Sequence, residues 1–384
     1  MNLALLATVL MRRSELRRHE RWSRVRLEAH QAAALRELRD FAYARSPFYQ
    51  RFHKGLTLRP LHELPVLTKT ELMERFDDIV TDREVRRADV EAHLPRLDHD
   101  ERFLGRYWVA STSGSTGRRG LFLWDSDEWT TVLASYSRAN EWAGVAPGLG
   151  RRMRLAVVSS TAPWHQSARV GATVRGVLVP TIRIDSGEPI GTIVDRLNAF
   201  RPECLVAYAS MARLLAEEQL AGWLRISPGA VTSASECSRH AGLHLYEDLV
   251  IAEPVDERHR PVPPGVPAAK LLVTVLFSRT QPLIRYEMSD RVWLAAEPCP
   301  CGRVFACLGG VEGRQEDVVR VAGAKPGFDE RALEEALGRA LAAAGAVVPA
   351  VRVERVERIP RTAAGKAPFV RAERQRDESR RANS

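Results

Sequence analysis

The feature that most constrains the fold is an alternation of short apolar runs and amphipathic stretches between residues 121 and 208. The runs "LFLWD", "MRLAVVSS", "VRGVLVPTIRI" and "CLVAY" are typical of strands. The stretches "SDEWTTVLASYSRANEWAGV" and "PIGTIVDRLNAFRP" are typical of helices, the first capped near Ser126 and the second ended by Pro202. Strands that are joined through helices run parallel, so the alternation predicts an α/β fold with much parallel sheet.

The residues before this core predict helices. One helix is expected from about Ser14 to Ala44 and is broken at Pro47. Thr68 and Glu71 have the spacing of a capping box and predict a further helix start. The apolar side of the long helix is expected to contain Leu27, Ala34, Leu35 and Leu38.

The residues after the core predict a region rich in strands and then a second domain. The chain has 384 residues, which is more than one compact core usually holds. We expect a large N-terminal α/β domain with mixed and parallel sheets over residues 1–310, including a β-rich subdomain at about 249–310. A small α+β C-terminal domain is expected over residues 311–384.

Charge and cysteine content narrow the class of protein. Lys plus Arg is 57 and Asp plus Glu is 48, a formal charge of +9. The arginines are spread out and no nucleic-acid motif accompanies them, which favours a solvated basic surface that attracts anionic substrates and no nucleic-acid partner. Five cysteines do not form a disulfide framework.

The first twenty residues predict a helix and no stable membrane insertion. Their apolar run precedes the positive charges, the reverse of a secretory signal, and it is too short to span a bilayer. We expect a cytoplasmic protein, with interfacial membrane contact as the minor alternative.

The stretch "STSGSTGRRG", Ser111–Gly120, is a candidate phosphate loop. Backbone N–H groups of a glycine-rich turn, hydroxyls and cations together hold phosphate. The Gly-Lys-Ser/Thr ending of the common P-loop is absent. From composition alone, a flexible linker is equally compatible.

Four motifs in a fixed order extend this interpretation: "STSGSTG", "PLIRYEMSD", "EGRQEDV" and "RIPRTAAGKAPFV". In this order they resemble the adenylate-forming enzymes. Together with "LPVLTKTEL" and "GLHLYEDLVIAEPVDERHRPVPPG", the chain resembles the phenylacetate–coenzyme A ligase branch from about Leu35 to Val370.

The resemblance implies a two-step reaction. An acid, expected to be aromatic, reacts with ATP to give an acyl-adenylate and pyrophosphate, and Mg²⁺ neutralises the phosphates. The thiol of coenzyme A or of an acyl-carrier protein then displaces AMP and forms a thioester. The small C-terminal domain is expected to be mobile between the two steps.

The resemblance also assigns residue roles. Asp290 and Arg314 are expected on the ribose side, and Lys366 at the α-phosphate. A turn aspartate and a solvated lysine are the alternatives for Asp290 and Lys366. Arg118 and Arg119 stand where relatives often have a lysine. The ATP phosphates would be wrapped by Ser111, Thr112, Ser113, Gly114, Ser115, Thr116 and Gly117.

Two further sets are less specific. Trp164, His165 and Tyr208 lie where the family lines its acid pocket, and packing in the core is an equal alternative for them. Some members of the branch bind a metal near "ECSRHAGLH" and "PCPCGR". The corresponding tetrahedral structural zinc set contains Cys237, His244, Cys299 and Cys301, and reduced thiols without metal are the alternative.

One expected segment is missing. The branch has a helix and a Tyr-x-x-(Ser/Thr)-Glu motif that bind adenine and Mg²⁺, but "VTSASECSRHAGLHLYED" joins the two flanks directly. Glu236 fits the "Glu-Cys" of the following segment and not the missing motif. This apparent internal deletion leaves two hypotheses: an active acid–thiol ligase, or a silent member that binds a ligand or partner.

Overall fold

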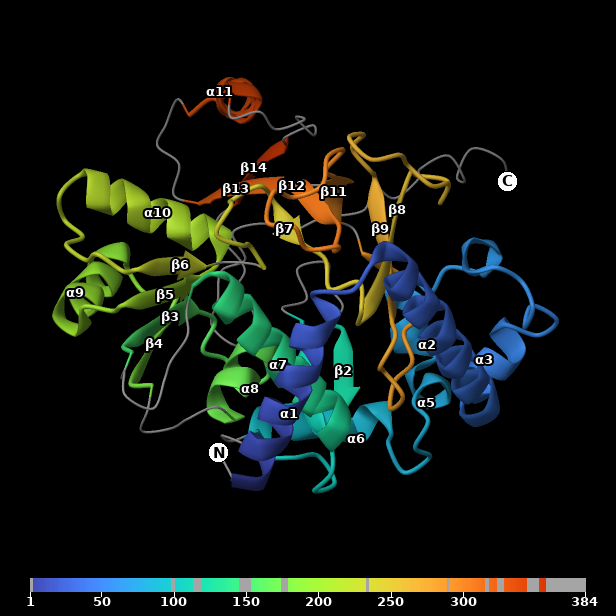
Figure 1. Ribbon diagram of the computed structural model, residues 1–384. Coiled ribbons are helices and arrows are strands. Elements are labelled where there is room, and N and C mark those ends of the chain that lie inside the picture. Colours follow the sequence, from blue (N-terminus) through green and yellow to red (C-terminus); the bar gives the residue numbers. More distant parts are fainter. Residues whose placement is uncertain are drawn as a thin grey trace.

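The computed structural model in Figure 1 consists of helices packed around several small sheets. It describes residues 3–97, 101–112, 119–144, 153–173, 179–232, 235–288, 290–314, 318–322, 328–343 and 352–356.

Two helices, α1 (Leu3–His19) and α2 (Arg24–Arg45), begin the chain. The prediction of one continuous helix over Ser14–Ala44 is wrong, because the chain turns between them. Ser23 ends the turn: its hydroxyl accepts a hydrogen bond from the backbone N–H of Arg26 at 3.3 Å and caps the start of α2.

The predicted apolar side of α2 is confirmed, since Leu27 and Leu38 are fully buried. The predicted break at Pro47 is confirmed too, and a new helix, α3 (Pro47–Phe52), starts there. Both helices pack around a cluster that contains Tyr49. Proline suits this place because its missing N–H has no partner in a first helical turn.

Short helices continue the N-terminal region. Thr68 and Glu71 form the predicted capping box, in which each side chain accepts from the other residue's backbone N–H at 3.2 Å. The elements are η1 (Leu61–Glu63), α4 (Lys69–Glu74), α5 (Phe76–Ile79), α6 (Arg87–His93) and η2 (Leu94–Arg96).

An antiparallel hairpin, β1 (Trp108–Ser111) and β2 (Leu121–Trp124), brackets the glycine-rich stretch. Helix α7 (Ser126–Trp142) follows directly. Its cap is Asp125, next to the predicted position, and the carboxylate accepts two backbone N–H groups at 3.0 and 2.9 Å. Helix α1 packs along α7 (Figure 1).

A parallel sheet is present, as predicted, but the run "LFLWD" is not part of it, because it forms β2 of the antiparallel hairpin. The strand order of the sheet is β4-β3-β5-β6, with all pairs parallel. Helices α9 and α10 share one buried apolar cluster with β3, β4 and β5. The elements are β3 (Leu155–Ser159), α8 (Gln166–Thr173), β4 (Thr181–Asp185), α9 (Ile190–Phe200), β5 (Cys204–Ala207), α10 (Ala209–Leu220) and β6 (Ala230–Thr232).

The region after residue 242 is rich in antiparallel strands, as predicted. One sheet has the order β10-β9-β8 and the other β11-β12-β7. The strands are β7 (Leu243–His244), β8 (Val250–Val255), β9 (Lys270–Val275), β10 (Tyr286–Met288), β11 (Asp290–Leu294) and β12 (Cys307–Arg314).

The tail contains β13 (Val318–Ala322), α11 (Glu330–Ala343) and β14 (Arg352–Val356), with β13 and β14 paired in parallel. The expected boundary between residues 310 and 311 falls inside β12, which stays paired with β11 as far as Arg314. The division into two domains and the mobility of the tail remain predictions, and this pairing favours a boundary after Arg314.

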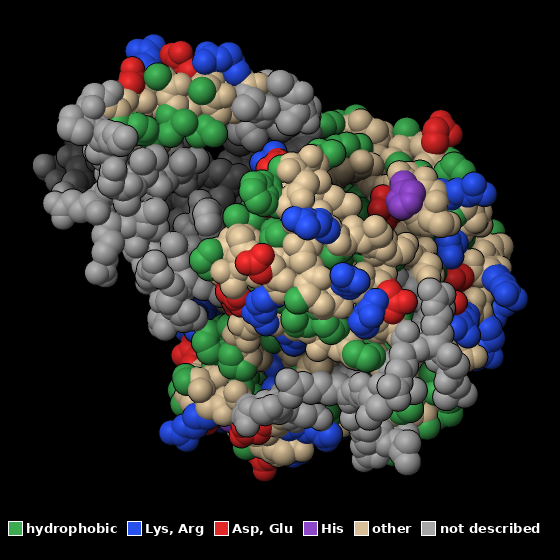
Figure 2. Space-filling view, turned by 90° about the vertical axis from the view of Figure 1, so that its left-hand side faces the viewer, with side chains coloured by type: hydrophobic (Ala, Val, Ile, Leu, Met, Phe, Trp, Pro, Cys, Tyr) green, Lys and Arg blue, Asp and Glu red, His purple; other side chains and the backbone are tan. Residues whose placement is uncertain are grey.

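Figure 2 shows Lys and Arg side chains scattered among other types on one face of the molecule. That distribution is typical of a solvated basic surface. Within the described ranges, no helix has the length and apolar character needed to cross a membrane.

Candidate active site

The described ends of the glycine-rich stretch form a closed neck. The backbone N–H of Thr112 donates to the carbonyl of Gly120 at 2.9 Å, and the N–H of Gly120 donates to Thr112 Oγ1 at 2.8 Å. Ser111 is buried at the end of β1 and pairs with Leu121 of β2. The rest of the predicted loop lies outside the described residues: Ser113, Gly114, Ser115, Thr116 and Gly117.

Gly120 is glycine for a steric reason. A Cβ atom there would lie 3.1 Å from Cε2 of Phe122 and 3.4 Å from Thr112 Oγ1. The first contact is tight and the second is close to ordinary van der Waals distance, so a larger residue would require the ring of Phe122 to shift slightly.

Trp164 joins the segment after β3 to this neck. Its carbonyl accepts a hydrogen bond from the N–H of Ser111 at 2.8 Å. The guanidinium carbon of Arg119 lies 5.4 Å from the centre of the Trp164 ring, within the range of a cation–π contact. The arrangement holds one cation beside the glycine-rich stretch. His165, which precedes α8, accepts from the N–H of Arg169 through its carbonyl at 2.9 Å.

Tyr208 lies at the carboxyl edge of the parallel sheet. Its hydroxyl accepts from the N–H of Ser160 at 3.2 Å, and 42% of the residue is exposed. Ser160 follows β3 and Tyr208 follows β5, so both stand where strands of open α/β sheets present ligand-binding groups. Tyr208 is therefore an accessible residue at a favourable edge, whereas Trp164 is a packed one.

Asp290 and Arg314, predicted from distant motifs, are brought together. They are register partners at one end of the antiparallel β11–β12 pair. Asp290 is half-buried. Lys366, the predicted catalytic lysine, lies outside the described residues.

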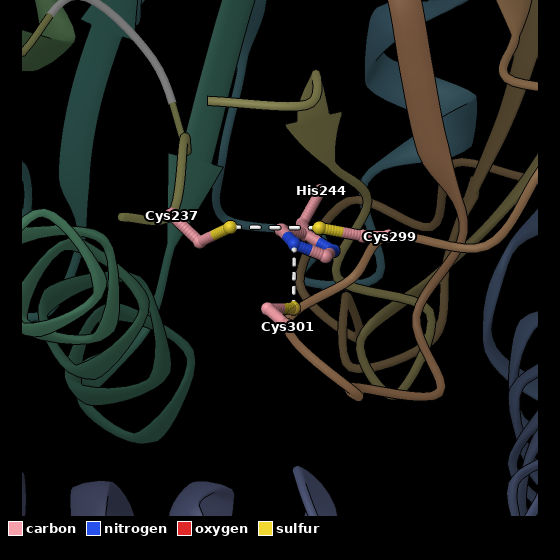
Figure 3. A group of neighbouring side chains, drawn as sticks. All are labelled: Cys237, His244, Cys299 and Cys301. Carbon is pink, nitrogen blue, oxygen red and sulfur yellow. Dashed lines mark hydrogen bonds between the residues drawn. The ribbon is translucent and has the colours of Figure 1, made fainter. Parts of the chain in front are cut away.

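The four predicted metal ligands converge (Figure 3). The ligand atoms of Cys237, His244, Cys299 and Cys301 all lie within 4.8 Å of one another, and Cys301 is the least buried of the four. Sγ of Cys237 is 3.6 Å from Sγ of Cys299, and Sγ of Cys301 is 3.4 Å from Nε2 of His244. Three sulfurs and one imidazole nitrogen are a donor set that suits tetrahedral zinc.

The histidine is oriented for such a role. Its other ring nitrogen, Nδ1, is 3.3 Å from the carbonyl oxygen of Phe305. A histidine that donates through Nδ1–H to a backbone carbonyl leaves Nε2 as a lone pair for a metal. Burial lowers the pKa of His244, which favours this neutral form.

The thiols are not equivalent. Burial opposes ionisation of Cys301, but hydrogen bonds from Arg303 outweigh it and lower the pKa of this thiol. Burial raises the pKa of Cys299. Arg303 is itself held, since its guanidinium carbon lies 4.6 Å from the ring centre of Trp142 and its Nε lies 3.5 Å from a carboxylate oxygen of Glu20.

Cys307 is a neighbour that the sequence interpretation missed. Its Sγ is 3.3 Å from Nδ1 of His244, and burial raises the pKa of this thiol to about 12. A thiol with that pKa stays protonated near neutral pH. Its position six residues after Cys301, at the start of a strand that pairs with β7, is the signal that marks it.

The short connection between β6 and β7, where the expected segment is missing, contains a few defined contacts. Glu236 forms a bridge with Leu243, and its carboxylate oxygen lies 3.2 Å from Nδ1 of His240. Glu236 is thus paired within the connection.

Comparisons of sequence and of structure both find similarity to acyl-CoA ligases. No protein-family model matches the chain. A phenylacetate–coenzyme A ligase from Thermus thermophilus is 25% identical in a match of length 354 that includes 78% of this chain and 73% of that protein.

Solved structures of 2-hydroxyisobutyryl-CoA ligase show the same fold. One, in the postadenylation state with 2-HIB-AMP, matches with a TM-score of 0.61 and 17% identity over 93% of this chain and 92% of its own. Another, an open conformation with 2-HIB-AMP and CoA, matches with a TM-score of 0.59 and 20% identity over 78% of this chain and 77% of its own.

Proposed function

We propose that the chain, which is similar in sequence to a phenylacetate–coenzyme A ligase and in fold to 2-hydroxyisobutyryl-CoA ligase, is an adenylate-forming enzyme that activates a carboxylic acid with ATP and forms a thioester. The relatives with which it shares sequence or fold are named as acyl-CoA ligases, one of them captured with an acyl-AMP and CoA.

The proposed reaction has two steps. A carboxylate oxygen attacks the α-phosphorus of ATP, the bond to the bridging oxygen breaks, and pyrophosphate leaves. Mg²⁺ bound to the phosphates would balance their charge. A thiolate of coenzyme A or of a carrier protein then attacks the acyl carbon, and AMP leaves. Both steps develop negative charge on phosphate oxygens, so fixed cations and N–H groups lower the barriers.

The chain's own residues supply these groups in the proposal. The Ser111–Gly117 loop holds the phosphates, and Arg119 on Trp164 adds a cation beside it. Asp290 accepts from the ribose hydroxyls, with Arg314 as its neighbour across the strand pair. Lys366 stabilises the α-phosphate during adenylation. Tyr208 lines the acid side of the site with His165.

The observation that carries the proposal is the neck. The Thr112–Gly120 hydrogen bonds and the Ser111–Trp164 hydrogen bond join the glycine-rich stretch directly to the segment that follows β3. A flexible linker of the same composition would not be expected to have its ends fixed by three hydrogen bonds. The loop therefore starts and ends at fixed points beside the carboxyl edge of the parallel sheet.

We also propose that Cys237, His244, Cys299 and Cys301 bind a structural zinc ion. The ion would join the connection after β6 to the loop before β12, two segments that already share one buried cluster through Cys237, Cys299 and Phe305. Its role is to hold these segments, and no chemical step passes through it.

The second candidate is a catalytically silent member that binds a ligand or partner. One observation favours it: a short connection runs from β6 to β7 and contains no Tyr-x-x-Thr-Glu sequence. Without the residues of that motif, adenine would need contacts with other parts of the chain.

Acid-dependent ATP–pyrophosphate exchange separates the two candidates. We expect exchange with at least one member of a panel of aryl and arylacetic acids, and a decrease of ~10²–10³-fold in the Lys366→Ala variant. No exchange with any acid, together with no ATP binding by calorimetry, would establish the silent member.

A further inference from the structure

A cavity of about 360 Å³ lies beside the candidate active site. Its walls come from β2, α7, the first residue of α8, the segment 244–250, and β9 with the turn that follows it. Among the described residues that line it, Trp164, His165 and Tyr208 do not appear. Its lining is therefore a different set of residues from the one predicted for the acid pocket, although Gln166 directly follows His165.

The walls are apolar and rich in aromatic rings. Phe122, Trp124, Tyr246 and Phe277 all line the cavity. The rings of Phe122 and Trp124 are inclined by 29° to each other, with centres 6.4 Å apart. Flat rings of this kind attract other flat rings, because offset and edge-on contacts between aromatic groups are favourable beyond the burial of their area.

Most polar groups in the lining are already satisfied. The amide of Gln281 donates to the carbonyl of Leu121 and accepts from the N–H of Leu123. The hydroxyl of Ser135 donates to the carbonyl of Val132 in its own helix. These groups face the cavity without demanding a polar ligand.

Gln166 is different. It lines the cavity at the first turn of α8, it is half-buried, and its side-chain amide finds no hydrogen-bond partner in the described part of the chain. An amide N–H₂ at a helix N-terminus is suited to donate to a carboxylate. Gln166 follows Trp164 by two residues, and Trp164 is bonded to Ser111 at the neck.

Phe122 connects the cavity to the glycine-rich stretch. Its ring forms part of the cavity wall on one side and lies against Gly120 on the other. A ligand whose rings fill the cavity and whose carboxylate meets Gln166 therefore presents that carboxylate near the neck.

The size of the cavity limits the ligand. Roughly 150 Å³ is enough to hold benzene, so a single ring would leave more than half of this cavity empty. We infer that the cavity binds the acyl portion of a two-ring aromatic carboxylic acid, with Gln166 orienting the carboxylate. The identification of this acid as the substrate rests on the proposed function.

The test is direct binding without ATP. Isothermal titration calorimetry with 2-naphthylacetic, biphenyl-4-ylacetic and phenylacetic acid would measure the three affinities for the full chain. We expect at least one two-ring acid to bind tenfold or more tightly than phenylacetic acid. Equal affinities, or no binding of either two-ring acid, would overturn the inference.

Two variants locate the ligand. Ser135→Leu places a larger side chain in the cavity from α7, and we expect at least tenfold weaker binding of the two-ring acid. Ser137→Leu, two residues along the same helix and outside the cavity lining, is the matched control and should bind as the wild type does. Gln166→Met keeps the shape but removes the amide, and tenfold weaker binding is expected there too. If Ser135→Leu does not fold, Gln166→Met decides alone, and unchanged binding would overturn the assignment.

The same acids in ATP–pyrophosphate exchange separate this inference from the proposed function. Binding that is sensitive to Ser135→Leu but gives no exchange keeps the cavity assignment and refutes the ligase. Exchange that Ser135→Leu leaves unchanged keeps the ligase and refutes the cavity assignment.

Discussion

Asp290 and Arg314 face each other as register partners where β11 begins and β12 ends. Twenty-four positions separate them in the sequence, and they belong to two different motifs, "PLIRYEMSD" and "EGRQEDV". The antiparallel pairing alone brings them together. One nucleotide can therefore contact both residues if the ribose lies at this end of the strand pair.

Replacing Asp290 tests that placement. Asp290→Asn keeps the shape and removes the charge, and we expect the affinity for ATP to fall by about tenfold or more, since a hydrogen bond to a charged group is worth ~1.5–3 kcal/mol. Calorimetric titration with ATP is the measurement. Glu297→Gln changes an exposed acid in the same region and should have no effect. An unchanged ATP affinity in Asp290→Asn would remove the residue from the site.

Zinc content tests the cysteine–histidine cluster. We expect purified protein to contain one zinc ion per chain and to lose it in Cys301→Ser. A ligand that binds only the folded state at 1,000 times its Kd stabilises it by ~4 kcal/mol, so chelation should lower the free energy of unfolding by a similar amount. Mass spectrometry of the metal content and denaturant unfolding would measure both effects.

The matched control is Cys204→Ala. Cys204 is a buried cysteine of β5 outside the cluster, so its replacement should leave the zinc content unchanged. Wild-type protein without zinc would refute the metal site and leave a group of reduced thiols.

Local patterns could be predicted from the sequence, and long-range geometry could not. Strands β3, β4 and β5 of the parallel sheet, the capping box at Thr68 and the break at Pro47 depend on neighbouring residues and were predicted, whereas the short strand β6 was not. The turn between α1 and α2 was missed because the arginine-rich sequence around it is compatible with helix, and only the cap at Ser23 marks the new start.

The candidate site divides in the same way. The four metal ligands were predicted as a set from a family resemblance, but the approach of Cys307 to His244 depends on the pairing of β12 with β7. The cavity is harder to predict from the sequence than the metal ligands are. Its walls come from five separate segments, and Gln166 was not singled out although it directly follows His165.

Arg138 and Asp248 form a buried ion pair that should be important for stability. Both side chains are inaccessible to solvent, and the guanidinium meets the carboxylate through two bonds of 2.8 and 2.6 Å. His19 of α1 reaches the same carboxylate through Nδ1 at 2.8 Å. The pair therefore joins α7, the segment before β8 and the N-terminal helix.

Asp248→Ala leaves the Arg138 charge buried without its partner, and we expect a loss of ~3–5 kcal/mol in the free energy of unfolding. Equilibrium urea unfolding monitored by tryptophan fluorescence is the measurement. Glu91→Ala removes an exposed i,i+4 partner of Arg87 and should change stability by less than ~0.5 kcal/mol. Similar values for the two variants would show that the buried pair contributes little.

His53 provides a buried group whose protonation opposes folding. Its ring is 4% exposed, and Nε2 has no hydrogen-bond partner among the described residues. Burial, and to a smaller extent the charge of Arg39, lowers the pKa of His53 to about 4. The folded protein therefore holds this ring neutral where an unfolded chain would protonate it.

Lowering the pH should destabilise the protein through His53. Below the ordinary histidine pKa of about 6.5 the unfolded state binds a proton that the folded state does not, so the free energy of unfolding falls between pH 6.5 and 4, by up to ~3 kcal/mol. His53→Phe keeps the ring packing and should remove this part of the pH dependence. Urea unfolding at pH 7 and pH 5 measures it, with His62→Gln, whose side chain is 62% exposed, as the control. If His53→Phe loses as much stability as the wild type between these two pH values, the ring is already accessible to protons in the folded state.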